Sequence, residues 1–173
     1  SVYSGGAGAN ARTFCGAAIS AFPYTEDFSA GVVPPSCWSE IITNTGYNWK
    51  TSTTNAGWAD VDYDPAPAAQ NEWLVTPTLD FTSLAHPRLS FSWFMSYYWS
   101  VDPGNNYDLN CKISINGGVT WTQLWSEADE GVFINWTPYT RTINLLAYAG
   151  QSNVKIAWQY VGNDGAQAGI DNI

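Results

Sequence analysis

The 173-residue sequence has few charged residues, and positive ones are especially scarce. Charged residues make up 12% of the chain, and 6 lysines and arginines stand against 15 aspartates and glutamates, for a formal net charge of -9. Nucleic-acid-binding proteins need a basic surface for the phosphate backbone, so we expect no nucleic-acid partner. Anionic membranes and sulfated or uronic polymers are disfavoured for the same Coulombic reason. The acidity itself has two interpretations, solubility alone or the binding of cations.

Histidine is almost absent, which removes many catalytic devices. The one histidine, His86, lies in a segment that leads from a loop into an expected strand. Zinc enzymes usually hold their metal with two or more histidines, and no GxSxG nucleophile turn accompanies His86. The glycine-rich residues 5–8 lack the lysine and the following helix of a phosphate loop. We therefore expect that the protein is not an enzyme. A carboxylate pair of the glycosidase type stays open as a minority alternative, because the 15 acidic residues offer many pairs.

Cysteines and long apolar runs are also few. Cys15, Cys37 and Cys111 match no zinc-binding spacing. The sequence does not decide whether Cys15 and Cys37 form a disulfide, whereas Cys111 lies in an alternating run and is expected to be a buried thiol. No apolar run approaches the roughly 20 residues of a membrane-spanning helix, so we expect no membrane insertion. Because the chain begins at Ser1 and stops at Ile173, we expect it to belong to a longer, secreted precursor.

Aromatic residues and alternating patterns are what the sequence has in abundance. Aromatics reach 16%, with 10 tryptophans and 10 tyrosines. Residues 1–21 are rich in glycine and alanine and are expected to be a lead-in or linker, and residues 22–173 a single domain. Short alternating runs predict strands, and Asn116-Gly117 predicts a hairpin between two of them. The runs are Leu89–Tyr98, Leu109–Ile115, Val119–Trp125, Arg141–Leu145, Val154–Val161 and Gly169–Ile173. This pattern predicts an all-β fold, an antiparallel β-sandwich with jelly-roll topology.

Acidic residues provide candidate metal ligands. Asp60, Asp62 and Asp64 occupy alternate positions, where their oxygens would point the same way, as Ca²⁺ requires. The alternative interpretation is an acidic surface loop. Glu26, near the start of the domain, and Asp171, near its end, could share one ion if the first and last strands lie side by side. A structural Ca²⁺ is therefore expected.

Several aromatic residues fall in expected loops, where no core position is obvious. Flat, exposed rings are suited to stacking on sugar rings and to protein interfaces, while Asn, Asp and Gln side chains can bind hydroxyl groups. Trp99, Tyr98 and Tyr97 are the first candidates for ligand binding, because they precede the polar residues 100–106. Trp58 and Tyr63 are the second. Tyr107 belongs to the same group of loop aromatics, and for each residue singly core packing remains the alternative.

Several segments, taken in order, carry one resemblance: residues 23–28 (PYTEDF), 35–38 (PSCW), 71–77 (NEWLVTP), 89–91 (LSF), 113–121 (ISINGGVTW), 148–151 (YAGQ), 154–156 (VKI) and 169–173 (GIDNI). The sequence resembles the cleaved-adhesin (choice-of-anchor J) domains, which are similar to MAM domains and occur on secreted bacterial proteins. The resemblance covers residues 22–173 and implies a jelly-roll sandwich, export from a Bacteroidetes-type bacterium and attachment to proteases, glycoside hydrolases or adhesins. It also implies structural calcium, for which Glu26 and Asp171 fit better than Asp60, Asp62 and Asp64, a segment without the glycines of the acidic loop found in such domains.

Together these features predict a non-catalytic carbohydrate-binding or adhesion module of a larger secreted bacterial protein. Its expected partners are a polysaccharide or a glycan on a host or cell surface, and the parent multidomain protein. The alternative is a structural or protein-interaction domain that accompanies a protease or another hydrolase and has no affinity for sugars.

Overall fold

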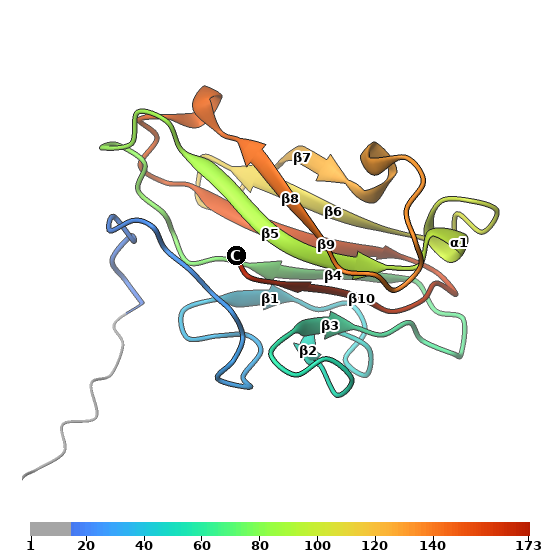
Figure 1. The fold of residues 1–173 in the computed structure, drawn as a ribbon. Helices are drawn as coiled ribbons and strands as arrows, with labels where there is room; N and C mark the ends of the chain where they lie inside the picture. The colour runs from blue at the N-terminus through green and yellow to red at the C-terminus, as the bar shows by residue number, and fades with distance from the viewer. Residues whose placement is uncertain (1–14) are drawn as a thin grey trace, which may run out of the picture.

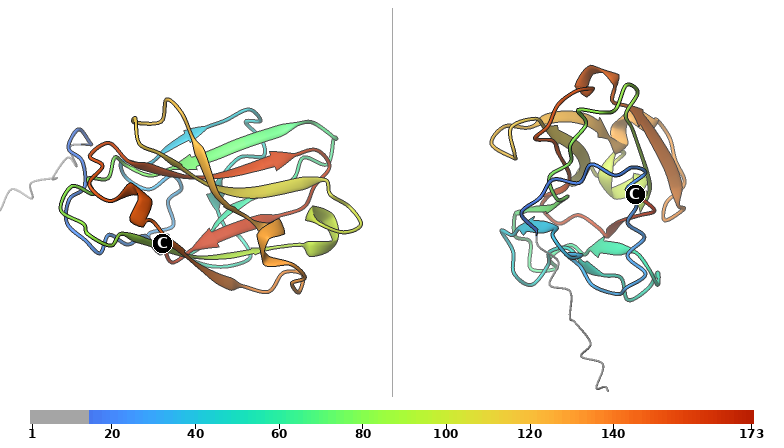
Figure 2. Two further views of the ribbon diagram at one scale, coloured as in Figure 1. Left: turned by 90° about the horizontal axis from the view of Figure 1, so that it is seen from above. Right: turned by 90° about the vertical axis from the view of Figure 1, so that its left-hand side faces the viewer.

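The structure of the protein is a computed structural model that describes residues 15–173. Ten strands form two antiparallel sheets of five strands each, which lie face to face (Figures 1 and 2). The first sheet has the order β1 (Ser39–Ile41), β4 (Gln70–Val75), β9 (Lys155–Gly162), β6 (Tyr107–Ser114), β7 (Thr122–Ser126). The second has the order β2 (Lys50–Thr51), β3 (Ala59–Val61), β10 (Ala168–Asp171), β5 (Arg88–Met95), β8 (Tyr139–Asn144). The predicted β-sandwich is confirmed.

Alternation along the strands places one face of each sheet in the core. In β5, Leu89, Phe91 and Trp93 are buried, whereas Ser90 is exposed and Ser92 half-buried. In β9, Ile156, Trp158 and Tyr160 are buried, as their alternation predicts. Tryptophans of both sheets meet in the core, where the Trp93 and Trp125 rings lie 5.1 Å apart. Aromatic rings bury large areas and stabilise this interface between the sheets.

The β6–β7 connection is longer than the predicted hairpin turn at Asn116-Gly117-Gly118. Gly117 adopts a φ of 72°, in the left-handed region that glycine tolerates. However, Ser114 Oγ accepts a hydrogen bond from the Gly118 amide (2.8 Å), and Asn116 Oδ1 accepts one from the Thr120 amide (2.9 Å). These side chains accept hydrogen bonds from backbone amides of the turn. Residues 119–121 therefore stay outside the strand, and β7 begins at Thr122 and not at Val119.

The N-terminal part of the described chain is fastened to the sandwich at two points. Cys15 and Cys37 form a disulfide with a Cα–Cα distance of 5.1 Å, which settles the pairing that the sequence left open. The Ile19 amide donates to the Thr78 carbonyl, and the Asp80 amide to the Ile19 carbonyl, both at 2.8 Å. Residues 1–14, which make up most of the predicted lead-in, lie outside the described residues. Cys111 is a buried free thiol, as expected, and burial raises its pKa.

Short helices and long loops close the two ends of the sandwich. Helix α1 (Tyr97–Ser100) follows β5 at one end, at the right of Figure 1. The 3₁₀ helices are η1 (Glu127–Glu130) and η2 (Leu146–Tyr148). The C-terminal Ile173 lies toward the opposite end, within the body of the molecule (Figure 1). No helix within residues 15–173 is long and apolar enough to cross a membrane.

Candidate ligand-binding site

A cavity of about 550 Å³ opens at the α1 end of the sandwich. Four loops from distant parts of the sequence form it together with α1: the loop between β1 and β2, the loop after β3, the loop between η1 and β8, and the loop between β9 and β10. Its aromatic lining is Tyr47, Tyr63, Trp99 and Trp136, and its polar lining includes Asp62, Asp164 and Gln167. We call it the aromatic pocket. Its size is in the range of small-ligand sites.

Helix α1 positions Trp99 through its N-cap. Ser96 is extended, and its Oγ accepts a hydrogen bond from the Trp99 amide at 3.3 Å, the usual role of an N-cap serine. Asn135 Oδ1 accepts two further hydrogen bonds, from the Tyr98 amide (3.0 Å) and from Ser96 Oγ (3.1 Å). The side chain of Asn135 therefore links the η1–β8 loop to the start of α1.

The same link positions Trp136. The Trp136 amide donates to the Met95 carbonyl at 2.9 Å, and the residue has a φ of 61°, in the left-handed region. This conformation is unfavourable for a bulky residue, so the surrounding hydrogen bonds must maintain it. Trp136 is 46% exposed and Trp99 is 41% exposed, so each presents a large part of its ring to the pocket and to solvent.

The loop that follows α1 folds back closely on the helix. The Gly104 amide donates to the Tyr98 carbonyl, and the Asn106 amide to the Trp99 carbonyl, both at 2.9 Å. A Cβ atom at Gly104 would lie 2.8 Å from both of these carbonyl oxygens, so only glycine fits. The backbone of Trp99 is thereby held on both sides.

Two buried residues, Asp60 and Tyr107, support the polar wall of the pocket through hydrogen bonds to Gln167. Gln167 Nε2 donates to Asp60 Oδ2 at 2.7 Å. The Tyr107 hydroxyl donates to the Gln167 carbonyl (3.1 Å) and accepts a hydrogen bond from the Ser96 amide (3.0 Å). Tyr107 thus belongs to the core, unlike the loop aromatics with which the sequence groups it, and it joins the two sides of the pocket. Burial raises the pKa of Asp60 to about 6, because little solvent stabilises its charge.

The pocket has an acidic character. Asp62 forms an ion pair with Lys50 of β2, and both side chains are partly exposed. Asp164 is exposed, and its carbonyl accepts a hydrogen bond from Asn106 Nδ2 at 2.8 Å. The residues that line the pocket include no lysine, arginine or histidine. A ligand with its own negative charge would therefore be repelled.

The structure brings together only some of the aromatic residues that the sequence singles out. Trp99 and Tyr63 meet in the pocket, and Tyr98 is exposed with its ring 5.0 Å from that of Trp99. Tyr97 is half-buried against Phe133, and Trp58 packs on Phe94 on the outer face of the second sheet. Sequence reasoning missed Tyr47 and Trp136. The signal that selected Trp99, an aromatic in a segment without strand alternation, applies equally to Trp136.

The candidate metal ligands fall into two groups. Asp60, Asp62 and Asp64 do not share one site, because each carboxylate has a different partner: Gln167, Lys50 and Asn44. Within residues 15–173, no group of three or more His, Cys, Asp or Glu side chains is arranged to hold a metal ion.

Glu26 and Asp171, by contrast, lie near each other, as expected. Glu26 and Ile173 exchange two backbone hydrogen bonds of 2.9 Å. Burial, followed by the negative charges of Asp27 and Glu26, raises the pKa of Asp171. Asp171 Oδ1 is buried and has no hydrogen-bond partner.

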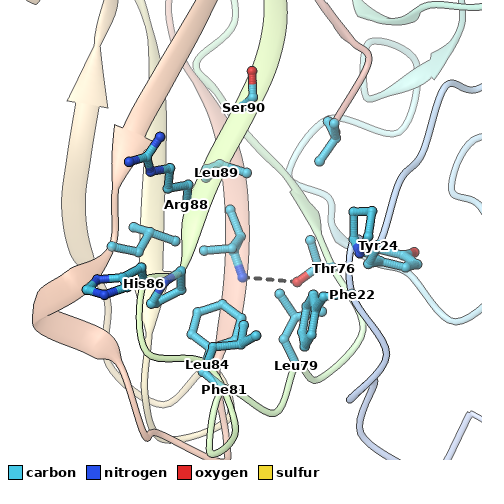
Figure 3. A pocket seen from close by; sticks show the side chains of 15 residues that line it. Phe22, Tyr24, Thr76, Leu79, Phe81, Leu84, His86, Arg88, Leu89 and Ser90 are labelled. Atoms are coloured by element: carbon cyan, nitrogen blue, oxygen red, sulfur yellow. Dashed lines mark hydrogen bonds between the residues drawn. The ribbon is translucent and has the colours of Figure 1, made fainter.

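Two other surfaces are distinct from the aromatic pocket. Toward the opposite end, an apolar cavity of about 350 Å³ is lined by Phe22, Leu79 and Leu89, with His86 and Arg88 at its edge (Figure 3). On the outer face of the first sheet, the Trp73 and Trp121 rings lie 5.4 Å apart, and Lys112 Nζ lies 5.1 Å from the Trp73 ring centroid. These two tryptophans form a second, smaller aromatic surface.

No family model and no curated protein matches the sequence. Among solved structures, the K3 cleaved adhesin domain of Lys-gingipain from Porphyromonas gingivalis is similar, with 19% identity, a TM-score of 0.62, and coverage of 87% of this chain and 95% of that domain. The chain has an adhesin-like jelly-roll fold. The same fold occurs in TmCBM61 in complex with beta-1,4-galactotriose (14% identity, TM-score 0.56, coverage 84% and 90%). It also occurs in the CBM22-2 xylan-binding domain of Paenibacillus barcinonensis Xyn10C (8% identity, TM-score 0.51, coverage 86% and 95%). These structural similarities show the fold, and at identities below 20% they do not show the ligand.

Proposed function

We propose that this adhesin-like domain is a non-catalytic carbohydrate-binding module whose sugar site is the aromatic pocket. The observation that carries the proposal is the convergence of Trp99 from helix α1, and of Trp136 and Tyr63 from two separate loops, into one cavity. All three rings keep more than a third of their surface exposed, at 41%, 46% and 39%. Large exposed apolar surfaces gathered in one place are uncommon on a monomeric protein unless they bind something.

The chemistry of the pocket suits a neutral sugar. Aromatic faces can stack on the apolar faces of pyranose rings, and the tyrosine hydroxyls and indole N–H groups can donate hydrogen bonds. Asp164 and Gln167 offer oxygens that accept hydrogen bonds from sugar hydroxyls. Two proteins with the same fold support a carbohydrate ligand, since one is in complex with beta-1,4-galactotriose and the other is a xylan-binding domain.

Binding measurements with matched tryptophan variants test the site. We expect a soluble neutral polysaccharide, chosen from a panel by affinity electrophoresis, to retard the native protein. Trp99→Ala and Trp136→Ala should each weaken binding about 30-fold, equivalent to the roughly 2 kcal/mol typical of a central aromatic contact. Trp121→Ala is the matched control, because it removes an indole from the outer face of the first sheet.

The outcomes separate the alternatives. Loss of binding in Trp121→Ala with retention in Trp99→Ala would move the sugar site to the sheet face. If titration calorimetry with every polysaccharide of the panel gives only the heat of dilution, the second candidate function is favoured. This function is a structural or protein-interaction domain without sugar affinity. Turnover of any panel member would contradict the non-catalytic assignment and would support the carboxylate-hydrolase alternative.

We also propose structural calcium near Glu26 and Asp171. The unpartnered, buried Oδ1 atom of Asp171 and the adjacent acidic side chains fit a hard divalent cation, which would compensate their mutual repulsion. Ca²⁺ should raise the melting temperature of the native protein, and EDTA should reverse the effect. In Asp171→Asn the melting temperature should no longer respond to Ca²⁺. A melting temperature of the native protein that is the same in Ca²⁺ and EDTA would refute the site.

The setting of the module is part of the proposal. The Cys15–Cys37 disulfide is typical of proteins that fold in an oxidising compartment, which supports secretion. We propose that the module belongs to a larger secreted bacterial protein and holds it on a polysaccharide or a surface glycan. Recovery of the protein from the culture medium of the source organism would test secretion.

A further inference from the structure

Gln167 contributes an amide group to the polar wall of the aromatic pocket, which consists of Asp62, Asp164 and Gln167. Gln167 Nε2 donates hydrogen bonds to Asp60 Oδ2 at 2.7 Å and to Thr54 Oγ1 at 3.5 Å. Gln167 Oε1, at the other end of the amide, has no hydrogen-bond partner in the described part of the chain. The oxygen of this amide is therefore left for a ligand.

Asp60 is buried at a place where its carboxylate is poorly solvated. It lies in β3, between β2 and β10, and its Oδ1 atom has no hydrogen-bond partner among the described residues. Gly169 is opposite Asp60 in the β3–β10 register, and a Cβ atom there would lie 2.5 Å from Asp60 Oδ1. Only glycine leaves room for this carboxylate. A buried, incompletely paired charge lowers stability, so a neutral side chain would suit a purely structural role better.

The carboxylate differs from a neutral side chain because it only accepts hydrogen bonds. An ionised Asp60 therefore binds Nε2 of the Gln167 amide and cannot bind Oε1. A protonated Asp60, or the amide of the Asp60→Asn variant, can also donate a hydrogen bond. The Gln167 amide can then turn over and present Nε2 to the pocket. The charge on Asp60 thus decides which end of the Gln167 amide meets a ligand.

We propose that Asp60 is a positioning residue that holds Gln167 Oε1 toward the ligand, so that the polar wall only accepts hydrogen bonds. The carboxylates of Asp62 and Asp164 are acceptors as well. Such a wall selects a sugar that points free hydroxyl groups at it, and discriminates against the same sugar with those hydroxyls methylated. This inference rests on the proposed sugar site in the aromatic pocket and specifies which face of the sugar the site recognises.

Proton binding by Asp60 provides a way to observe this role. Burial, together with the negative charge of Asp62, raises the pKa of Asp60 to about 6 against the opposing effects of Ser52, Gln167 and Lys50. The side chains that β10 and β5 place against Asp60 carry no charge. The ionised form, which positions the amide, is present above the folded-state pKa and is lost as the pH falls through it. Sugar affinity should therefore fall over the same pH range.

Calorimetric titrations between about pH 5 and pH 8, with a neutral polysaccharide that does not itself titrate, test the positioning role. The native protein should bind about 5-fold more tightly at pH 8 than at pH 5, the size expected for one hydrogen bond. Asp60→Asn should bind equally at both pH values, with the affinity of the native protein at pH 5. Asp80→Asn should keep the native profile. It is the matched control, because Asp80 Oδ1 only caps a turn at Thr82, away from the pocket.

A methylated derivative of the same polysaccharide tests the selectivity. At pH 8 the native protein should prefer the unmodified polymer, and this preference should be about 5-fold smaller in Asp60→Asn, whose Gln167 amide can also donate to an ether oxygen. The added bulk of the methyl groups affects both proteins alike. The difference between the two proteins therefore reports on hydrogen bonding.

The orientation of the Gln167 amide can also be followed without a sugar. The NMR signals of its Nε2 protons, identified by their loss in Gln167→Met, should shift with a midpoint near pH 6 in the native protein. They should not shift over this range in Asp60→Asn. If this titration is observed and no polysaccharide binds, the proposed sugar function fails, whereas the control of the Gln167 amide by Asp60 stands.

Three results would overturn the inference. One is a native affinity that does not change between pH 5 and pH 8, even if Asp60→Asn binds more weakly, because a uniformly weaker site indicates only a structural role. Another is an equal preference for the unmodified polymer in the native protein and in Asp60→Asn. The third, which requires no ligand, is a Gln167 amide signal that does not titrate near pH 6.

Discussion

At the α1 end of the sandwich, the cavity is lined by exposed aromatic rings on loops whose backbones are hydrogen-bonded in place. Toward the opposite end, the cavity is lined mainly by apolar side chains, with His86 and Arg88 at its edge. The more apolar cavity would usually be taken as the ligand site. We favour the aromatic pocket instead, because exposed aromatic rings on a hydrogen-bonded backbone suit a sugar, whereas a mainly apolar lining does not.

Of the changes that test this comparison, removal of the Cys15–Cys37 disulfide should have the largest effect on stability. Cys15→Ala/Cys37→Ala should destabilise the protein by about 3 kcal/mol, because a loop with a sequence separation of 22 residues is no longer closed in the unfolded chain. The melting temperature should fall by roughly 6–12 °C in a protein of this size. Sugar affinity, measured well below the melting temperature, should not change, because the disulfide lies away from the aromatic pocket. A parallel loss of affinity would show that the two ends are coupled.

A second prediction concerns Asp60 and pH. Its folded-state pKa of about 6 lies above the ordinary value of 3.8, so the unfolded chain releases this proton first. The folded protein therefore loses stability as pH rises from about 4 to about 6. Asp60→Asn avoids the buried charge and should be more stable than the native protein by about 2 to 3 kcal/mol at pH 8, with no advantage below pH 4.

Chemical denaturation of both proteins at several pH values would measure this difference. The groups that face Asp60 are Asp62, whose charge raises its pKa, and Lys50, Ser52 and Gln167, whose interactions lower it. Lys50→Met, which removes the nearby positive charge, provides the control and should move the transition of Asp60 to higher pH. A pH-independent difference between native protein and Asp60→Asn would contradict the buried-charge explanation.

The smallest expected effect concerns Asn135. Asn135→Ala removes the acceptor for the Tyr98 amide and for Ser96 Oγ, so the η1–β8 loop is no longer fastened to α1. Sugar affinity should fall about 5-fold, corresponding to roughly 1 kcal/mol for the lost hydrogen bonds. Asn135→Asp, which keeps the acceptor oxygens, should recover most of the affinity. Affinity equal to that of the native protein in Asn135→Ala would show that Trp99 and Trp136 are held by other contacts.

Much of the sandwich could be predicted from the sequence because strand alternation is a local pattern. Phe91 and Trp93 in β5, and Trp158 and Tyr160 in β9, have the inward orientation that their spacing predicts. Tyr107 follows loop residues in the sequence but is buried, because it begins β6. Its hydroxyl accepts a hydrogen bond from the Ser96 amide and donates one to the Gln167 carbonyl, and a local sequence pattern does not indicate these partners. The hairpin after β6 is longer than expected because Ser114 and Asn116 hydrogen-bond to the turn backbone.

The sequence by itself determined the class of fold, the buried face of the long strands and the surplus of aromatic residues over core positions. These follow from composition and from a period of two residues, which require no knowledge of distant neighbours. Only the tertiary structure decided that Trp136 joins Trp99 and Tyr63, and that Tyr24 and Ser90 line the same cavities at the other end. Both depend on which strands become neighbours when the two sheets stack, and that is settled by the packing of the whole core.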